Sequence, residues 1–169
     1  MTLQATNAGI DYQQRVSAFF LVLMLRNKDM DLFLPGANGK IQWIQLESME
    51  DIDDMVLSNE RGNNYYFQIK RKISFQNNPK SEFYKTCIQF VEQYEKGREK
   101  TENYYLITSE ESSSKVTERL RRLLNHIRVS NSLKIPSLNK EDKRIFDDFT
   151  NMIDLIFSQI PAADFTPCR

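Results

Sequence analysis

The fold of this chain is decided by residues 54–70, which read DMVLSNERGNNYYFQIK. Two runs with strand character, 54–59 and 65–71, flank a turn signal that consists of Gly62 and its neighbouring asparagines. Glycine and asparagine tolerate the left-handed backbone that tight hairpin loops require. The stretch therefore predicts an antiparallel hairpin centred on Gly62.

The register of this hairpin determines which side chains meet. A hairpin centred on Gly62 places Asp54 opposite Lys70 and Val56 opposite Gln68, about 4.5–5.5 Å apart at Cβ. A slip of one residue would move one of the strands onto the opposite face. The prediction that Asp54 meets Lys70 depends on this register.

Alternation along the second strand predicts one apolar face and one polar face, because successive side chains point to opposite sides of a sheet. The expected core face carries Tyr65, Phe67 and Ile69, and the expected site face carries Tyr66, Gln68 and Lys70.

An earlier run, residues 41–47, also has strand character. A return turn around Glu50 and Asp51 would bring Glu47, at the end of this run, beside Asp54. Two carboxylates, an amide oxygen and a lysine would then converge at the ends of three strands.

Such a set has the chemistry needed for metal-dependent hydrolysis of a phosphodiester. Carboxylates bind Mg²⁺, and a nearby lysine stabilises the attacking hydroxide or the charge that develops on phosphorus. A purely structural interpretation stays open, because acidic turns are commonly solvated and a lysine at a strand end often protects a sheet edge. On that interpretation Glu50, Asp51 and Asp53 are ordinary surface residues.

Composition indicates an ordinary globular protein with one domain over residues 1–160 and a tail or the start of a linker over 161–169. The 169 residues are 40% hydrophobic and 27% charged, and the net charge is zero. A basic field over the whole chain is excluded, so nucleic-acid binding would need a local patch. Arg71 and Lys72, directly after Lys70, are the candidates; the arginines of residues 119–128 are better explained as a solvated helix face.

Several other classes of protein are disfavoured. Two cysteines, Cys87 and Cys168, provide neither a disulfide framework nor zinc spacing, which fits a reducing cytoplasm. His126 is the only histidine, so histidine-based catalysis is nearly excluded. The apolar run 19–25 is too short to span a bilayer and is expected to be a buried helix face.

The remaining pattern predicts an α/β (α+β) fold in the order αβββαβαα, with a mixed central sheet of about four strands flanked by helices. The first eight residues are expected to form a loose leader. The expected helices are 11–28, one opened by Pro79 and Ser81 and ended at Gly97, one begun at 112–114 and broken by Pro136, and 140–160; the expected strands are 41–47, 54–59, 65–71 and 104–108.

This order, with Asp54 opening one strand of the hairpin and Gln68-Ile69-Lys70 ending the next, resembles the core of the PD-(D/E)XK restriction-endonuclease-like superfamily. In that superfamily an aspartate opens the second strand and a (D/E)-x-K motif ends the third. Here glutamine takes the place of the usual acid. Its amide oxygen can bind Mg²⁺ but adds no charge, which gives Glu47 more weight as a ligand.

More narrowly, the chain resembles the N-terminal endonuclease domain of bacterial antiphage effectors, namely the CD-NTase-associated nucleases of CBASS defence and related STAND-type ATPases. The resemblance covers about residues 9 to 110. It rests on an ordered set of four segments, which are Gly9 to Gln13, Leu46-Glu47, Glu50 to Asp54, and Phe67 to Lys70.

The resemblance implies Mg²⁺-dependent cleavage of double-stranded DNA with little sequence preference, and Mn²⁺ can replace Mg²⁺. It also implies coupling to a sensor module and activity as a homo-oligomer. No membrane partner is expected, and the cysteine usage favours a cytoplasmic location. The implied metal ligands are Asp54, Gln68 and Glu47; Lys70 would position water; Gln13 and Asp53 would be accessory residues, and Arg71 and Lys72 would contact DNA. For Gln13 a buried helix-capping role stays equally open.

Two other interpretations remain. The chain could be a catalytically inactive nuclease-like domain that acts as a DNA-binding or oligomerisation module, which the glutamine at position 68 keeps open. It could also be an α/β scaffold whose aromatic helices mediate assembly. The retention of Lys70 beside the carboxylates favours the active enzyme, because an inactive fold does not need that lysine.

Overall fold

The structure is a computed structural model that describes residues 3–34, 36–47, 52, 54–97, 102–133, 135 and 138–160. Its elements are α1 (Leu3–Leu25), the 3-10 turn η1 (Met30–Leu32), β1 (Ile41–Leu46), β2 (Met55–Asn59), β3 (Asn64–Lys70), α2 (Glu82–Gly97), β4 (Glu102–Thr108), the π-helical turn η2 (Lys115–Leu120), α3 (Arg121–Ser130) and α4 (Lys140–Gln159). The predicted class, mixed α and β with a four-stranded sheet, is confirmed.

The chain forms two compact units, which are described separately below. The first comprises the residues up to Arg71 together with 96–107, and the second comprises 72–95 and the residues from Thr108 onward.

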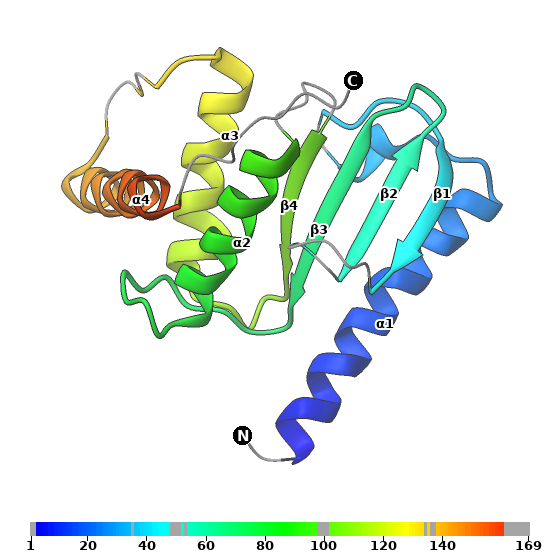
Figure 1. Cartoon of the computed structure of the whole chain (residues 1–169), viewed down its shortest axis with the longest axis horizontal. Helices are drawn as coiled ribbons and strands as arrows, with labels where there is room; N and C mark the ends of the chain where they lie inside the picture. The colour runs from blue at the N-terminus through cyan, green and yellow to red at the C-terminus, as the bar shows by residue number, and fades with distance from the viewer. Residues whose placement is uncertain are drawn as a thin grey trace. The chain divides into compact units, whose positions relative to one another are not determined.

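The first unit contains the sheet, whose strands lie in the order β1-β2-β3-β4 (Figure 1). The pairs β1/β2 and β2/β3 are antiparallel. Helix α1 contacts β1 and β3. Its buried side chains Phe20 and Leu23 join those of Leu57 and Phe67 in one apolar cluster. Burial of this cluster is the main source of stability for the unit, because apolar burial contributes about 25 cal/mol per Å².

The hairpin forms where predicted, but its predicted register is wrong by two residues. Val56 pairs with Tyr66 and not with Gln68. The loop is centred on Arg61, because Gly62 N–H donates to Asn59 O and Asn59 N–H donates to Asn63 O. Gly62 has φ of +78° and therefore occupies the left-handed position that closes a three-residue hairpin loop. An offset of two residues leaves every side chain on its predicted face.

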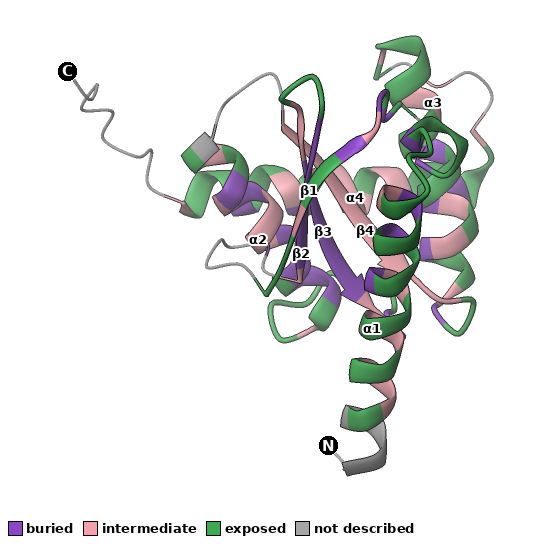
Figure 2. Ribbon diagram, turned by 90° about the vertical axis from the view of Figure 1, so that its right-hand side faces the viewer, coloured by how far each residue is buried: buried purple, intermediate pink, exposed green. Residues whose placement is uncertain are grey.

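Both faces of β3 are buried, although the sequence predicted a site on one of them (Figure 2). Phe67 stacks on Tyr105 on the core face. On the other face Tyr66 stacks on Tyr104, with ring centroids 5.7 Å apart. Tyr66 and Tyr104 both donate hydrogen bonds to the carboxylate of Glu102. Tyr66 on this face of β3 is therefore tied to the neighbouring strand β4.

Helix α1 differs from its predicted form in two ways. It begins at Leu3, so the expected leader over the first eight residues is wrong for the residues described there, and it ends at Leu25. Only one stripe of the apolar run 19–25 is buried, since Phe20 is 2% exposed whereas Leu25 is 80% exposed. Apolar residues surround this part of the helix, and a helix at the surface of a sheet buries only one side. The predicted buried face is therefore present at Phe20 and Leu23, whereas the other side of the run is exposed.

The second unit is held together by apolar side chains and by one buried carboxylate. Phe83 in α2 packs against Phe75 and Phe149. Asp142, in the first turn of α4, binds Arg119 at 3.0 Å and Arg122 at 2.5 Å. Helix α3 ends at Ser130, because Asn131 takes the left-handed conformation that commonly ends helices. The predicted stop at Pro136 was therefore too late.

Across the described segments, no helix has both the length and the apolar character that crossing a bilayer requires.

We predict that Asp142→Ala lowers the free energy of unfolding by about 2–3 kcal/mol, because two guanidinium groups and the helix N-terminus lose a carboxylate that is itself buried. Glu141→Ala is the matched control, since Glu141 pairs with Arg119 at 2.9 Å but is itself 54% exposed; its loss should be at most about 1 kcal/mol. Urea denaturation measures both. Equal losses in the two variants would contradict the prediction.

Candidate functional site

The site is organised around the carboxylate of Asp54, which precedes β2. Among the described residues, at least three N–H groups donate to it. Gln68 Nε2 and the backbone N–H of Ile69 both reach Oδ2 at 2.6 Å, and Gln13 Nε2 reaches Oδ1 at 3.2 Å. We refer to Gln13, Gln68 and the Ile69 N–H as the amide clamp. It joins α1, β2 and β3 at one end of the sheet.

The clamp explains why the strands end here. The last described β2/β3 pair is Met55 with Phe67, and Ile69 N–H, further along β3, donates to the Asp54 side chain. Hydrogen bonds to an ionised carboxylate are stronger than those between neutral groups, about 1.5–3 kcal/mol each. The carboxylate therefore both terminates the ladder and holds its own orientation.

Gln68 contributes a feature that the sequence did not reveal. Its side chain is 1% exposed, and among the described groups none donates to its Oε1. A buried acceptor without a donor costs about 1–3 kcal/mol. The amide cannot relieve this by turning over, because Oε1 would then meet Asp54 Oδ2 at about the 2.6 Å that now separates Nε2 from that oxygen.

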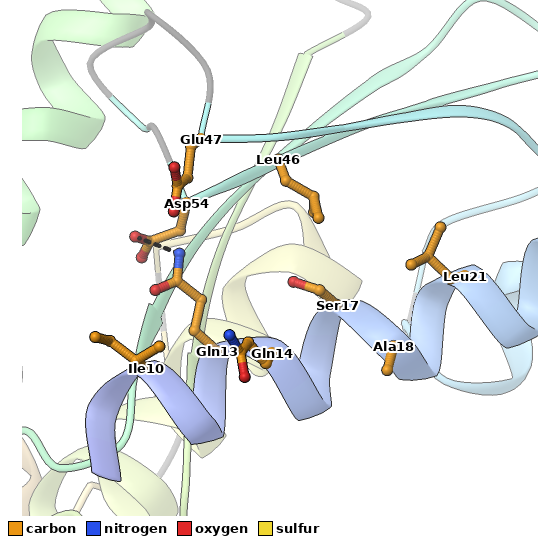
Figure 3. A pocket seen from close by; sticks show the side chains of 9 residues that line it. All are labelled: Ile10, Gln13, Gln14, Ser17, Ala18, Leu21, Leu46, Glu47 and Asp54. Atoms are coloured by element: carbon orange, nitrogen blue, oxygen red, sulfur yellow. Dashed lines mark hydrogen bonds between the residues drawn. The ribbon is translucent and has the colours of Figure 1, made fainter. Parts of the chain in front are cut away.

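Glu47 lies beside Asp54, as predicted. Its backbone N–H donates to Asp54 O at 3.3 Å, directly after the β1/β2 pair of Leu46 with Met55. Glu47 has φ of +50°, a left-handed conformation that costs a residue with a Cβ about 1–2 kcal/mol. Figure 3 shows the carboxylates of Glu47 and Asp54 next to each other, with Gln13 reaching Asp54 from α1.

A pocket of about 260 Å³ opens beside these two carboxylates. Its wall is formed by α1 and by the end of β1, and it changes from polar near Asp54 to apolar near Leu21 and Leu46 (Figure 3). Apart from Gln13, Glu47 and Asp54, the sequence did not predict the residues that line this pocket. The helical spacing of Ile10, Gln14, Ser17 and Leu21 would have placed them on one side of α1, but nothing in the sequence indicated that this side borders Asp54.

Lys70 is the last residue of β3 and is half-buried. The expected pairing of Asp54 with Lys70 is wrong, because the observed register places Gln68 at that position and the Gln68 side chain contacts Asp54. Lys70 lies two residues beyond Gln68, roughly 7 Å along the strand and on the same face.

The remaining predicted residues are Arg71 and Lys72, which the structure describes, and three acidic residues. Arg71 is half-buried and Lys72 is exposed, each directly after the strand. Asp53 and the acidic residues Glu50 and Asp51 lie outside the described residues.

Among the described residues, a divalent cation would need both carboxylate and amide oxygens as its ligands. In the described part of the chain, no three histidine, cysteine, aspartate or glutamate side chains are placed so that they could hold a metal ion together. Asp54, Glu47 and the unpaired Gln68 oxygen could together supply oxygen ligands, which Mg²⁺ prefers. The buried oxygen without a donor is the observation that favours such a group, because it would gain a partner if the Gln68 amide, whose Nε2 now faces Asp54, turned over toward a cation.

Other ionisable groups are poor candidates for catalysis. Burial raises the pKa of the Cys87 thiol to about 12, so the thiolate that nucleophilic chemistry requires is scarce at neutral pH. Burial likewise raises the pKa values of Tyr12 and Tyr65.

We predict that Glu47→Gly is more stable than Glu47→Ala by about 1 kcal/mol, because both variants lose the carboxylate and only glycine relieves the left-handed strain. Thermal or urea unfolding of the two variants measures the difference. Equal stability would show that position 47 is not strained.

Comparison with known proteins gives no relative on which to base an assignment: no family model matches the chain, and no significantly similar curated protein or solved structure was found.

Proposed function

We propose that this chain is a metal-dependent endonuclease domain that cleaves double-stranded DNA with little sequence specificity. Asp54, Glu47 and Gln68 would bind Mg²⁺, which Mn²⁺ can replace, and Lys70 would act on the water or the phosphate. The observation that carries the proposal is the amide clamp, which holds an acidic side chain at the strand ends beside a buried, unpaired amide oxygen.

A plain acidic turn would not need this arrangement. A solvated aspartate keeps its hydrogen bonds with water, whereas Asp54 is fixed by three protein donors. Glu47, which lies beside Asp54, has a strained left-handed backbone. Strain and unpaired buried groups gather at functional sites, where a fixed geometry is worth its energetic cost.

The roles of the residues follow from their positions. A bound divalent cation would supply Lewis-acid activation of the phosphate and of a water molecule. Asp54 would keep its carboxylate oriented because Ile69 N–H and Gln13 continue to hold it. Lys70, whose ammonium carries a positive charge, would stabilise the negative charge that develops on the phosphate oxygens.

The proposed partner is the DNA backbone. With a net charge of zero, the chain would attract phosphates only locally, and Arg71 and Lys72 follow Lys70 directly. A role in antiphage defence with a sensor module rests on the resemblance to CBASS and STAND-type effectors, and a cytoplasmic location rests on the cysteine usage; both are part of the proposal.

One observation favours the alternative of an inactive oligomerisation module. Apolar side chains are exposed on α1 and β1 of the first unit, among them Val22, Leu25, Trp43 and Leu46. Exposed apolar residues mark protein contacts where they form a contiguous patch, which association through α1 and β1 would require. Association through them would also suit an active enzyme that works as a homo-oligomer, so the mass in solution should be measured together with the activity.

We predict that the purified chain with Mg²⁺ converts supercoiled plasmid to nicked and linear DNA, and that Asp54→Ala and Lys70→Ala each lower the rate at least 100-fold. Removal of one preorganised charge typically costs about 10²–10³ in rate. The assay should span a range of protein concentrations, with the mass in solution measured at each.

Lys28→Ala is the matched control, because Lys28 is an exposed lysine of the same unit and should leave the rate unchanged. Cleavage that persists at the wild-type rate in both site variants would overturn the assignment. DNA binding without cleavage by the wild-type protein, at every concentration and with either metal, would support the inactive module.

A further inference from the structure

We propose that Gln68 is a two-position amide switch, which donates to Asp54 in the metal-free protein and turns over to offer its oxygen when a divalent cation binds. This inference rests on the proposed function only in taking Asp54 as a cation ligand. It concerns how the site is loaded, and it assigns Gln68 a role that a glutamate at the same position could not perform.

The metal-free position of the switch is determined by contacts. Asp54 Oδ2 accepts from Gln68 Nε2 and from Ile69 N–H, both at 2.6 Å. Asp54 offers no proton when ionised, so only the nitrogen of the amide can face it. The consequence is that Oε1 points to a place where no described group donates to it.

A cation reverses this preference. Two adjacent oxygen ligands of one octahedral Mg²⁺ lie about 3.0 Å apart, given Mg–O distances of about 2.1 Å. The Nε2 to Oδ2 distance of 2.6 Å is already close to that spacing. Rotation about the last side-chain bond of glutamine exchanges oxygen and nitrogen with little movement, because this torsion is broad and roughly two-fold. The switch therefore needs no change in the backbone.

The choice of glutamine follows from the metal-free state. A glutamate at position 68 would bring two carboxylates to hydrogen-bonding distance, and both could not be ionised without a cation between them. Glutamine instead replaces the cation with its own N–H group. The Asp54 carboxylate is then held in place without metal, and a cation must compete with an internal hydrogen bond before it binds.

The first test compares Gln68→Glu with Gln68→Met by thermal unfolding and by calorimetric titration with Mn²⁺. Without metal, Gln68→Glu should unfold at a lower temperature than the wild type at pH 8, and its affinity for Mn²⁺ should be at least tenfold higher. Gln68→Met keeps the length of the side chain but has neither the donor nor the amide oxygen, and it should lose the stabilisation by Mn²⁺. An affinity in Gln68→Glu equal to or below that of the wild type would overturn the switch.

The second test uses the wild-type protein, so that it does not depend on the folding of a variant. In ¹⁵N–¹H spectra the side-chain NH₂ signals of Gln68 should move when Mg²⁺ is added, because Nε2 leaves Asp54. The NH₂ signals of Gln13 should move less, since Gln13 Nε2 donates to the other oxygen, Oδ1. Unmoved Gln68 signals at a Mg²⁺ concentration that stabilises the protein would overturn the proposal.

The two proposals fail separately. If Gln68→Glu binds Mn²⁺ more tightly but the wild-type protein does not cut plasmid, the nuclease proposal is rejected and the switch proposal stands. If the wild-type protein cuts plasmid but the Gln68 NH₂ signals do not move on addition of Mg²⁺, the switch proposal is rejected and the nuclease proposal stands.

Discussion

The hydrogen bonds to the Asp54 carboxylate are the constraint on which the rest of the first unit depends. They end the β2/β3 ladder, since Ile69 N–H turns to the side chain of Asp54. They also bind α1 to the strand ends through Gln13, while the backbone of Asp54 receives Glu47 from β1. One residue thus ties three strands and a helix together. Any role for Asp54 as a ligand is therefore supported by a geometry that exists before a ligand arrives.

Local patterns predicted the hairpin and the meeting of Glu47 with Asp54, because both depend on short connections between neighbouring strands. The register failed for an equally local reason. Gly62 was placed at the centre of the loop, whereas its positive φ places it at the closing position of a three-residue loop. Composition alone does not separate these two roles of a glycine. The offset of two residues exchanged Lys70 for Gln68 as the neighbour of Asp54 without moving either to the other face.

What the sequence could not predict arises from packing over longer distances. Gln13 entered only through the resemblance, since nothing in α1 indicates that it reaches a residue 41 positions away. The run 19–25 is apolar on all sides, so its composition alone does not show that Leu25 is exposed while Phe20 and Leu23 face the sheet. The pocket beside Asp54 combines both limits, because it exists only where α1 crosses the end of β1.

Two locally unfavourable features distinguish this site from an ordinary acidic turn, namely a strained backbone at Glu47 and an unpaired buried oxygen on Gln68. Glycine at position 47 would remove strain, and an apolar residue in place of Gln68 would remove an unpaired buried oxygen. Both features lie against the same carboxylate, and proteins tend to accept such local conflicts where function requires them. A charged turn that only protects a sheet edge would require neither the backbone strain nor the unpaired oxygen. The coincidence of strain, an unpaired oxygen and a fixed acid is therefore the strongest physical support for the proposal that this end of the sheet binds a cation.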